Sequence, residues 1–181
     1  MDLLPQTLTT SRLILRQARL DDADELFQVY CGVPDCARYL TRGVHTSSLQ
    51  TAKFLKVWCI QAWTEQYASF AWVIAERHTD QPIGTFVVLR DGSGCQIHFG
   101  IGKQFWGRGL VVEAGTAAVK WLFENNTLSE LSTVCDAEHV RSQRVLAKLG
   151  FERKGALQQC LVIPAFGALA RDGVLYSRGK M

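Results

Sequence analysis

A glycine-rich segment near the middle of the chain has the residue types needed to bind an anion. It runs from Ile101 to Val111, reads IGKQFWGRGLV, and lies between a predicted strand and a predicted helix. The first N–H groups of a helix have no intrahelical partner and lie at its positive end. Glycine lets an anion approach the backbone closely, because no Cβ is in the way. The segment therefore predicts a phosphate-binding turn, for which a diphosphate is the natural ligand.

Two common phosphate-binding motifs do not fit this segment. Gly102 and Gly107 have the spacing of the P-loop, but the Lys and Ser or Thr of that motif do not follow Gly107. The dinucleotide motif G-x-G-x-x-G begins at Gly100 and Gly102 but has Phe105 in place of its last glycine. Both of these nucleotide-binding classes are excluded.

The elements around this segment follow from periodicity and from turn residues. We expect strands over 10–18, 70–76, 83–89, 95–102, 131–135, from 151 onward, and 173–177, and helices from Asp21 to Gly32 and over 46–67, 110–124 and 139–149. Gly100 and Gly102 within one strand indicate either a bulge or a close approach to the backbone. Antiparallel hairpins followed by a β-α-β crossover predict an α/β fold with a mixed sheet of about seven strands and helices on both faces.

Composition limits the possible classes of function. The chain has 181 residues and no visible linker, which predicts a single domain over 1–181. Its net charge of +3 is scattered, which argues against nucleic-acid binding. No apolar run approaches the roughly 18 residues of a membrane span. The six cysteines include no C-x-x-C pair, so we expect reduced thiols, a cytoplasmic protein and no metal.

Five segments together resemble the GCN5-related N-acetyltransferases (GNAT), in particular the RimJ and RimL ribosomal-protein acetyltransferase branch. In chain order they are Thr10–Arg16, Trp106–Gly109, Glu113-Ala114, Arg144–Phe151 and Arg171–Ser177. Each is a weak signal alone, but their order along nearly the whole chain is specific. The resemblance implies the GNAT fold, with two parallel strands splayed apart by a bulge and the pantetheine arm of a coenzyme filling the gap.

By this resemblance the chain uses acetyl-CoA as a co-substrate and needs no metal. The main chain near Ile101 is expected to bond the pantetheine arm and to stabilise the oxyanion of the reacting thioester. The turn that ends at Val111 is expected to hold the diphosphate, although Val111 replaces the usual small residue. The residues expected to bind the coenzyme are Ile101, Gly102, Trp106, Gly107, Arg108, Gly109, Leu110, Val111, His139 and Ser142.

The expected catalytic residues are Ser142 and His98. His98 is expected to replace a glutamate base that the family branch often has and this chain lacks. The branch often has Glu where this chain has Gln96, whose amide cannot accept a proton at neutral pH. His98 lies on the same side of the strand as Gln96, and its imidazole titrates near pH 6.5 when unperturbed. One interpretation is that His98 acts as the base, directly or through water. The other is that it only lines the cleft or packs. Ser142 donates to the departing thiolate, or is an ordinary helix serine. His139 replaces an Asn and either bonds the coenzyme arm or caps the helix.

The expected acceptor is a primary amine, favoured to be the N-terminal α-amine of a ribosomal protein. An α-amine with a pKa of about 7.8 is roughly 10–15% neutral at pH 7, whereas a lysine is below roughly 0.1% neutral. An enzyme with a weak base therefore suits an α-amine. The alternatives are a small amine (a polyamine, an amino acid or an antibiotic) and a non-catalytic acyl-CoA sensor. We expect no membrane and no nucleic-acid partner, and either a monomer or a homodimer.

Overall fold

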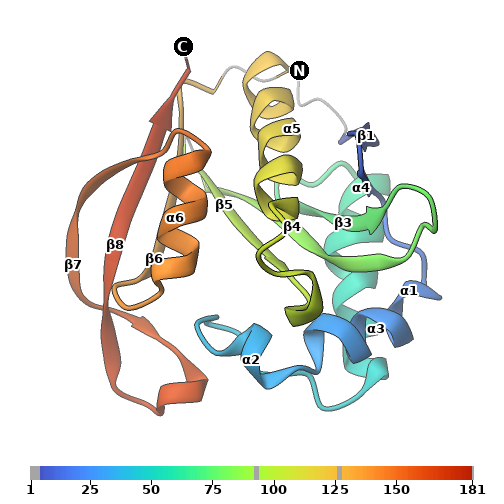
Figure 1. The fold of residues 1–181 in the computed structure, drawn as a ribbon, viewed down its shortest axis with the longest axis horizontal. Helices are drawn as coiled ribbons and strands as arrows, with labels where there is room; N and C mark the ends of the chain where they lie inside the picture. The colour runs from blue at the N-terminus through green and yellow to red at the C-terminus, as the bar shows by residue number, and fades with distance from the viewer. Residues whose placement is uncertain (1–4, 92–93, 126–127, 181) are drawn as a thin grey trace.

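The computed structural model describes residues 5–91, 94–125 and 128–180, which are built around one eight-stranded mixed sheet (Figure 1). The strand order is β1-β2-β3-β4-β5-β6-β8-β7, and only the β5–β6 pair is parallel. The strands are β1 (Leu8–Thr9), β2 (Leu13–Arg16), β3 (Phe70–Glu76), β4 (Pro82–Asp91), β5 (Gly94–Ile101), β6 (Glu130–Asp136), β7 (Glu152–Val162) and β8 (Ala170–Gly179). The predicted mixed sheet is confirmed, with β1 as a strand that the sequence analysis missed.

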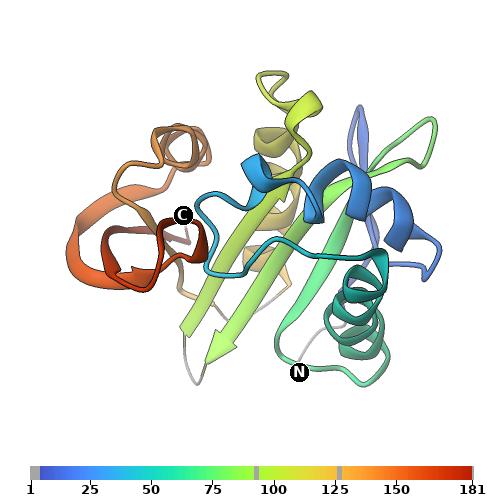
Figure 2. The ribbon, with the colours of Figure 1, turned by 90° about the horizontal axis from the view of Figure 1, so that it is seen from below.

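Helices cover both faces of the sheet, as predicted. The elements are α1 (Asp22–Leu26) with the π-turn η1 (Phe27–Cys31), α2 (Pro34–Ala37), α3 (Ser48–Leu55) with the π-turn η2 (Lys56–Gln61) and α4 (Ala62–Thr64), the 3₁₀ turns η3 (Lys103–Phe105) and η4 (Pro164–Phe166), α5 (Leu110–Glu124) and α6 (Val140–Lys148). Figure 2 shows the N-terminal helices, blue to teal, on the face of the central strands opposite α5. No described helix is both long and apolar enough to cross a bilayer.

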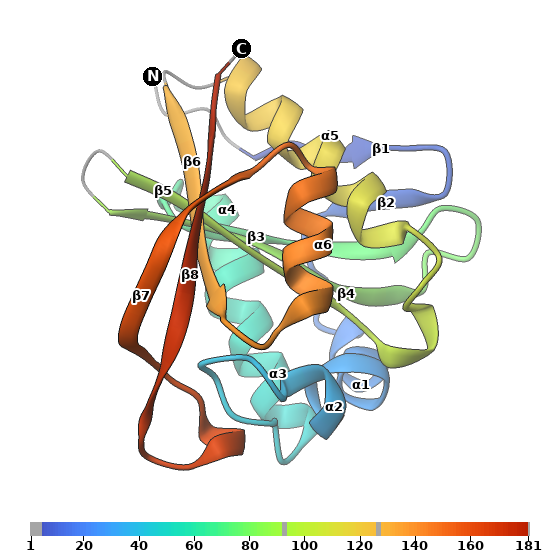
Figure 3. The ribbon, with the colours of Figure 1, turned by 60° about the vertical axis from the view of Figure 1, so that its left-hand side comes forward.

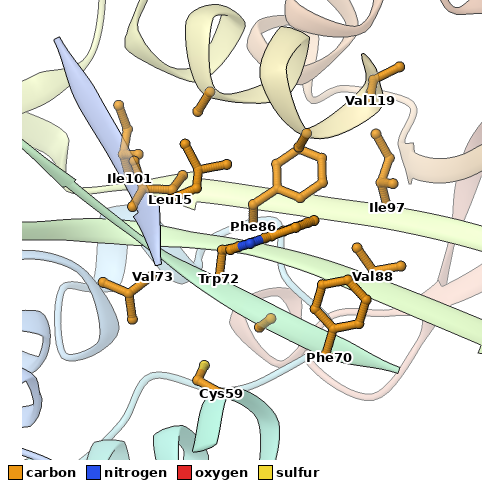
Figure 4. Close-up of a cluster of buried hydrophobic side chains, with 14 of the residues drawn as sticks. Leu15, Cys59, Phe70, Trp72, Val73, Phe86, Val88, Ile97, Ile101 and Val119 are labelled. Carbon is orange, nitrogen blue, oxygen red and sulfur yellow. The ribbon is translucent and has the colours of Figure 1, made fainter. Parts of the chain in front are cut away.

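The hydrophobic core lies on both sides of the central strands. Trp72 and Phe86 are fully buried on neighbouring strands, and Trp121 of α5 packs edge-on against Trp72 at 5.5 Å between ring centroids. Figure 4 shows Phe86 and Val119 on the side that α5 covers, with Cys59 on the other side. Burial of apolar groups on both faces fixes the positions of α5 and of the N-terminal helices relative to the sheet.

The two parallel strands β5 and β6 part soon after they meet. Their register contains a single pair, Gln96 with Ser132, and Figure 3 shows the strands diverging from that point. The predicted splay of these strands is therefore confirmed. The β4–β5 register continues without a shift from Asp91↔Gly94 to Gly84↔Ile101, so the expected bulge in β5 is wrong.

Close approach, the other interpretation of the β5 glycines, is confirmed. A Cβ on Gly100 would lie 2.3 Å from the hydroxyl of Tyr30, and one on Gly102 would lie 2.4 Å from the carbonyl oxygen of Val29. Both partners belong to η1, which packs directly on the end of β5. Only glycine permits this contact, so these residues hold the N-terminal helices against the strand that borders the gap.

The two edges of the sheet are β1 and β7, and most residues of β7 are exposed. Its pairing with β8 shifts register twice, between Arg153 and Gly155 and between Leu157 and Leu161. Between the second pair of residues, Gln159 has a positive φ of 47°. The edge is therefore irregular in two places.

Candidate active site

A cleft of about 700 Å³ opens where β5 and β6 diverge. Its walls come from the end of β5, the loop before α5, one side of α6, and α2 with the residues that follow it. The lining residues are Asp35, Cys36, Arg38, Tyr39, Leu40, Phe99, Gly100, Ile101, Lys103, Phe105, Trp106, Gly107, Gly109, Leu110, Val111, Val112, His139, Arg141, Ser142, Arg144, Val145 and Lys148. Segments far apart in the sequence therefore meet at the gap in the sheet.

The N-terminus of α5 points its free main-chain donors at this cleft. The first intrahelical bond runs from the N–H of Glu113 to the carbonyl of Gly109, so the preceding N–H groups have no partner within the helix. Gly107 and Gly109 have φ angles of 77° and 74°, a left-handed conformation that glycine adopts without strain. The loop thus presents several N–H groups at the positive end of a 15-residue helix, which is an arrangement suited to a diphosphate.

The edge of β5 that faces β6 supplies further main-chain groups. The N–H of Gly102 bonds the carbonyl of Ile83, so even-numbered residues of β5 bond β4, while Phe99 and Ile101 turn their N–H and C=O groups away from β4. The carbonyl of Ile101 accepts from Nε1 of Trp106 at 3.0 Å. The N–H of Ile101 and both main-chain groups of Phe99 face the gap, where an extended amide-containing chain can pair with them.

Basic side chains outnumber acidic ones around the cleft. Its lining contains five Lys or Arg residues and the single carboxylate Asp35, which forms an ion pair with Lys103 at 2.5 Å. The guanidinium of Arg141 lies 4.2 Å from the ring centroid of Trp106, so α6 and the glycine loop meet across the opening. A polyanionic ligand is favoured by this distribution of charge.

Glu113 in the first turn of α5 anchors the glycine loop to the start of the chain. Its carboxylate accepts from the hydroxyls of Thr10 and Ser11 at 2.6 and 2.9 Å and from the N–H and Nε of Arg12 at 2.8 and 2.6 Å. Arg12 also donates to the carbonyl of Arg108 at 3.0 Å. Burial raises the pKa of Glu113, but the hydrogen bonds from Thr10, Arg12 and Ser11 outweigh it and lower the pKa to about 2.

Ser142 and His139 both belong to the wall of the cleft that α6 forms. Burial raises the pKa of the neighbouring Cys135 thiol to about 11, against a smaller lowering by its hydrogen bond with Ser142. The ring of His139, at the N-terminal end of α6, lies 4.4 Å from that of Tyr39. Burial, and then the charge of Arg141, lower the pKa of His139 to about 4, so its ring is neutral near pH 7. Its side chain makes no capping bond to α6.

His98 lies close to the cleft but is not part of its lining. It shares a face of β5 with Gln96 and Gly100, the face that the N-terminal helices cover. The residue is half-buried, and burial lowers the pKa of its imidazole below the ordinary 6.5. At pH 7 the ring is therefore neutral and is able to accept a proton.

The structure brings most of the predicted site residues together. Ile101, Trp106, Gly107, Gly109, Leu110, Val111, His139 and Ser142 line the cleft. Three do not: His98, Gly102, which is packed against η1, and Arg108, whose side chain turns toward Glu76 at 3.7 Å. Arg38 and Tyr39, which also line the cleft, could not be found from the sequence, because the four helical residues of α2 before them give no periodic signal.

The chain is similar to known proteins in both sequence and structure. The family model described as acetyltransferase (GNAT) domain matches residues 12–152. The chain is 27% identical to the uncharacterized N-acetyltransferase p20 of Bacillus licheniformis over 84% of this chain and 86% of the relative. It is 31% identical to the [ribosomal protein uS5]-alanine N-acetyltransferase of Escherichia coli K12 over 42% of this chain and 40% of the relative. A solved RimL ribosomal L7/L12 α-N-protein acetyltransferase in complex with coenzyme A has a TM-score of 0.82 at 15% identity, covering 96% of this chain and 98% of the other.

Proposed function

We propose that this chain, which belongs to the GNAT acetyltransferase family, moves the acetyl group of acetyl-CoA onto the α-amine of a protein N-terminus. The acetyltransferase activity follows from the family, whereas the donor, the acceptor and the residue roles are our proposal. The observation that carries it is the N-terminus of α5, whose free N–H groups open onto the cleft between β5 and β6.

The residues of the cleft fit acetyl-CoA in three respects. Loop N–H groups from Gly107 to Val111 suit the diphosphate, because a helix N-terminus binds anions. The free main-chain groups of Phe99 and Ile101 suit the amides of a pantetheine arm lying as an extra strand. Arg144 and Lys148, farther along α6, add positive charge for the remaining phosphate.

The chain's own groups then assist acyl transfer. When bound, acetyl-CoA supplies the activated acetyl carbonyl and a thiolate leaving group. The N–H of Ile101, which faces the gap, stabilises the oxyanion that develops at that carbonyl. Ser142 donates its hydroxyl proton in a hydrogen bond to the leaving sulfur. His98 takes the ammonium proton of the acceptor through a water, since it lies outside the cleft lining.

Two observations support an α-amine acceptor. The relatives that act on ribosomal proteins are named as α-N-protein or alanine N-acetyltransferases. The neutral, partly buried His98 is also a weak base, which an α-amine tolerates better than a lysine does, because more of the α-amine is already neutral at pH 7.

The test combines calorimetry with a thiol-release assay. We expect coenzyme A to bind, and acetyl-CoA to release thiol in the presence of a peptide with a free N-terminus. A matched peptide with a blocked N-terminus and a free lysine is expected to react at least about tenfold more slowly. Faster acetylation of the blocked peptide would overturn the α-amine assignment, and the absence of any heat with coenzyme A would overturn the whole proposal.

A further inference from the structure

Two arginines in the segment after α2 have no carboxylate partner within the described chain. Arg38 is exposed and lines the cleft, whereas Arg42 lies deeper, with its Nη2 buried and without a hydrogen-bond partner among the described residues. An arginine that has no carboxylate partner in the protein keeps its guanidinium donors available for an anion that enters the cleft. The segment is therefore a candidate for recognition of a negatively charged ligand.

Arg38 is held at one end of the cleft by aromatic rings. Its guanidinium lies 5.8 Å from the ring centroid of Tyr39 and 5.6 Å from that of Phe166, which comes from the β7–β8 connection. Tyr39 in turn stacks on His139, at the N-terminal end of α6. Lys148 is at the other end of that helix, about 13 Å away at 1.5 Å per residue. Arg38 is thus separate from the basic residues that suit the terminal phosphate.

The carboxylates near Arg38 are already occupied. Asp35 pairs with Lys103, while Asp136 and Glu138 pair with Arg171 at 2.6 and 2.8 Å. Arg171 also lies over the ring of Phe166, at 4.0 Å, but its charge is compensated by those two acids. Two cleft-lining arginines at this end, Arg38 and Arg141, therefore have no ion pair among the described residues. Arg141 lies over Trp106 of the glycine loop, whereas Arg38 lies against Tyr39 and Phe166.

Arg42 adds positive charge behind the part of the cleft lining that Gly100 forms. Its guanidinium lies 5.1 Å from the ring centroid of Tyr30, whose hydroxyl packs against Gly100 in the cleft lining. The nearby His45 is buried, and burial followed by the charge of Arg42 lowers the pKa of its ring to about 4. The charges of Arg38 and Arg42 disfavour a second positive charge on an acceptor bound nearby, which argues against polyamines and other polycationic amines.

We propose that Arg38 selects acceptors that carry a carboxylate close to the reacting amine. The inference rests on the proposed acetyl transfer and narrows its substrate to anionic amines. Such a carboxylate belongs either to acidic side chains that follow a peptide N-terminus or to a free amino acid, and the guanidinium binds both by the same charge-assisted hydrogen bonds.

The experiment compares acceptors that differ only in charge. Three peptides share an N-terminal alanine and carry acidic, neutral or basic residues at the next two positions; free aspartate represents the amino-acid source. With the full chain and saturating acetyl-CoA, we expect kcat/KM to be at least about tenfold higher for the acidic than for the basic peptide. The preference should shrink as salt is raised, since the charges face solvent.

Variants assign the preference to Arg38. Arg38→Ala should remove most of it and Arg38→Glu should reverse it, while the KM for acetyl-CoA changes less than about twofold, a result that a merely structural role would not give. Lys56→Glu makes the same charge reversal at an exposed residue outside the cleft lining and should leave the preference intact.

The outcomes separate this inference from the function on which it rests. Equal rates for all three peptides, or an acidic preference that survives Arg38→Glu, would overturn the role of Arg38 while leaving acetyl transfer in place. A far better rate with free aspartate would identify the amino acid as the source of the carboxylate. If coenzyme A binds and no amine is acetylated, the proposed transfer fails and the selectivity falls with it.

Discussion

Replacement of Glu113 by glutamine tests whether the start of the chain holds the coenzyme loop. The carboxylate accepts four hydrogen bonds, from Thr10, Ser11 and twice from Arg12. Three of these bonds end on Oε1, and the fourth, from Nε of Arg12, ends on Oε2. A glutamine with its amide oxygen at the Oε1 position keeps an uncharged acceptor for three bonds but turns its NH₂ toward Nε of Arg12, so the ion-pair bond is lost. A hydrogen bond to a charged group contributes roughly 1.5–3 kcal/mol, so Glu113→Gln should cost about 2 kcal/mol. For a chain of this size that lowers Tm by about 4–8 °C.

The assay is thermal unfolding. The control is Glu124→Gln at the other end of the same helix, where the exposed Glu124 pairs with Lys120 at 3.8 Å. We expect the control to change stability by less than about 0.5 kcal/mol. The folded pKa of Glu113, about 2, lies below its ordinary 4.5. Its contribution is therefore complete above pH 4.5 and is lost as pH falls toward 2. A Tm change under about 2 °C, or one independent of pH across this window, would refute the reasoning.

Three further outcomes follow from the site. Gly102→Ala should destabilise by more than about 3 kcal/mol in urea unfolding, because its Cβ would meet a backbone oxygen at 2.4 Å. Gly109→Ala would only touch Nη2 of Arg12, at an ordinary contact distance of 3.8 Å, and should cost only about 1 kcal/mol for its positive φ. His98→Gln should lower the steady-state rate far more at pH 7 than at pH 9, where the acceptor amine is already neutral, and equal losses would remove His98 from the mechanism. Ser142→Ala should lower kcat about tenfold with little change in the KM for acetyl-CoA, since its bond to the departing thiolate forms only as the thioester breaks; a rise in KM alone would make it a binding residue.

The sequence predicts strongly periodic elements well and short ones poorly. The helix over 110–124 and the strand over 70–76 match the structure at both ends, because each has a clear periodicity bounded by turn residues. No helix was expected directly after Gly32, yet Pro34 opens α2 at a first-turn position that proline favours. The two-residue β1 is too short for any pattern and exists because it pairs with β2.

The candidate site likewise contains features that the sequence predicts and features that it does not. The glycine loop is predictable because its function depends on local backbone geometry and helix polarity. Arg38 is not, since its position depends on stacking with Phe166, more than a hundred residues later in the chain. The bond network of Glu113 is also long-range: Thr10-Ser11-Arg12 and Glu113 were both noted in the sequence, but nothing in their spacing shows that they touch.

The two register shifts of β7 bear on how copies of this chain associate. A regular edge strand presents evenly spaced main-chain N–H and C=O groups that can pair with a strand of another molecule. In β7 that spacing is interrupted near Lys154 and again at Gln159, whose N–H is taken by the side chain of Asp172 at 2.9 Å. A strand of a second molecule could therefore form main-chain hydrogen bonds with β7 over only a few consecutive residues. We therefore do not expect a homodimer of this chain to pair through β7, and this edge of the sheet is protected against the addition of further strands.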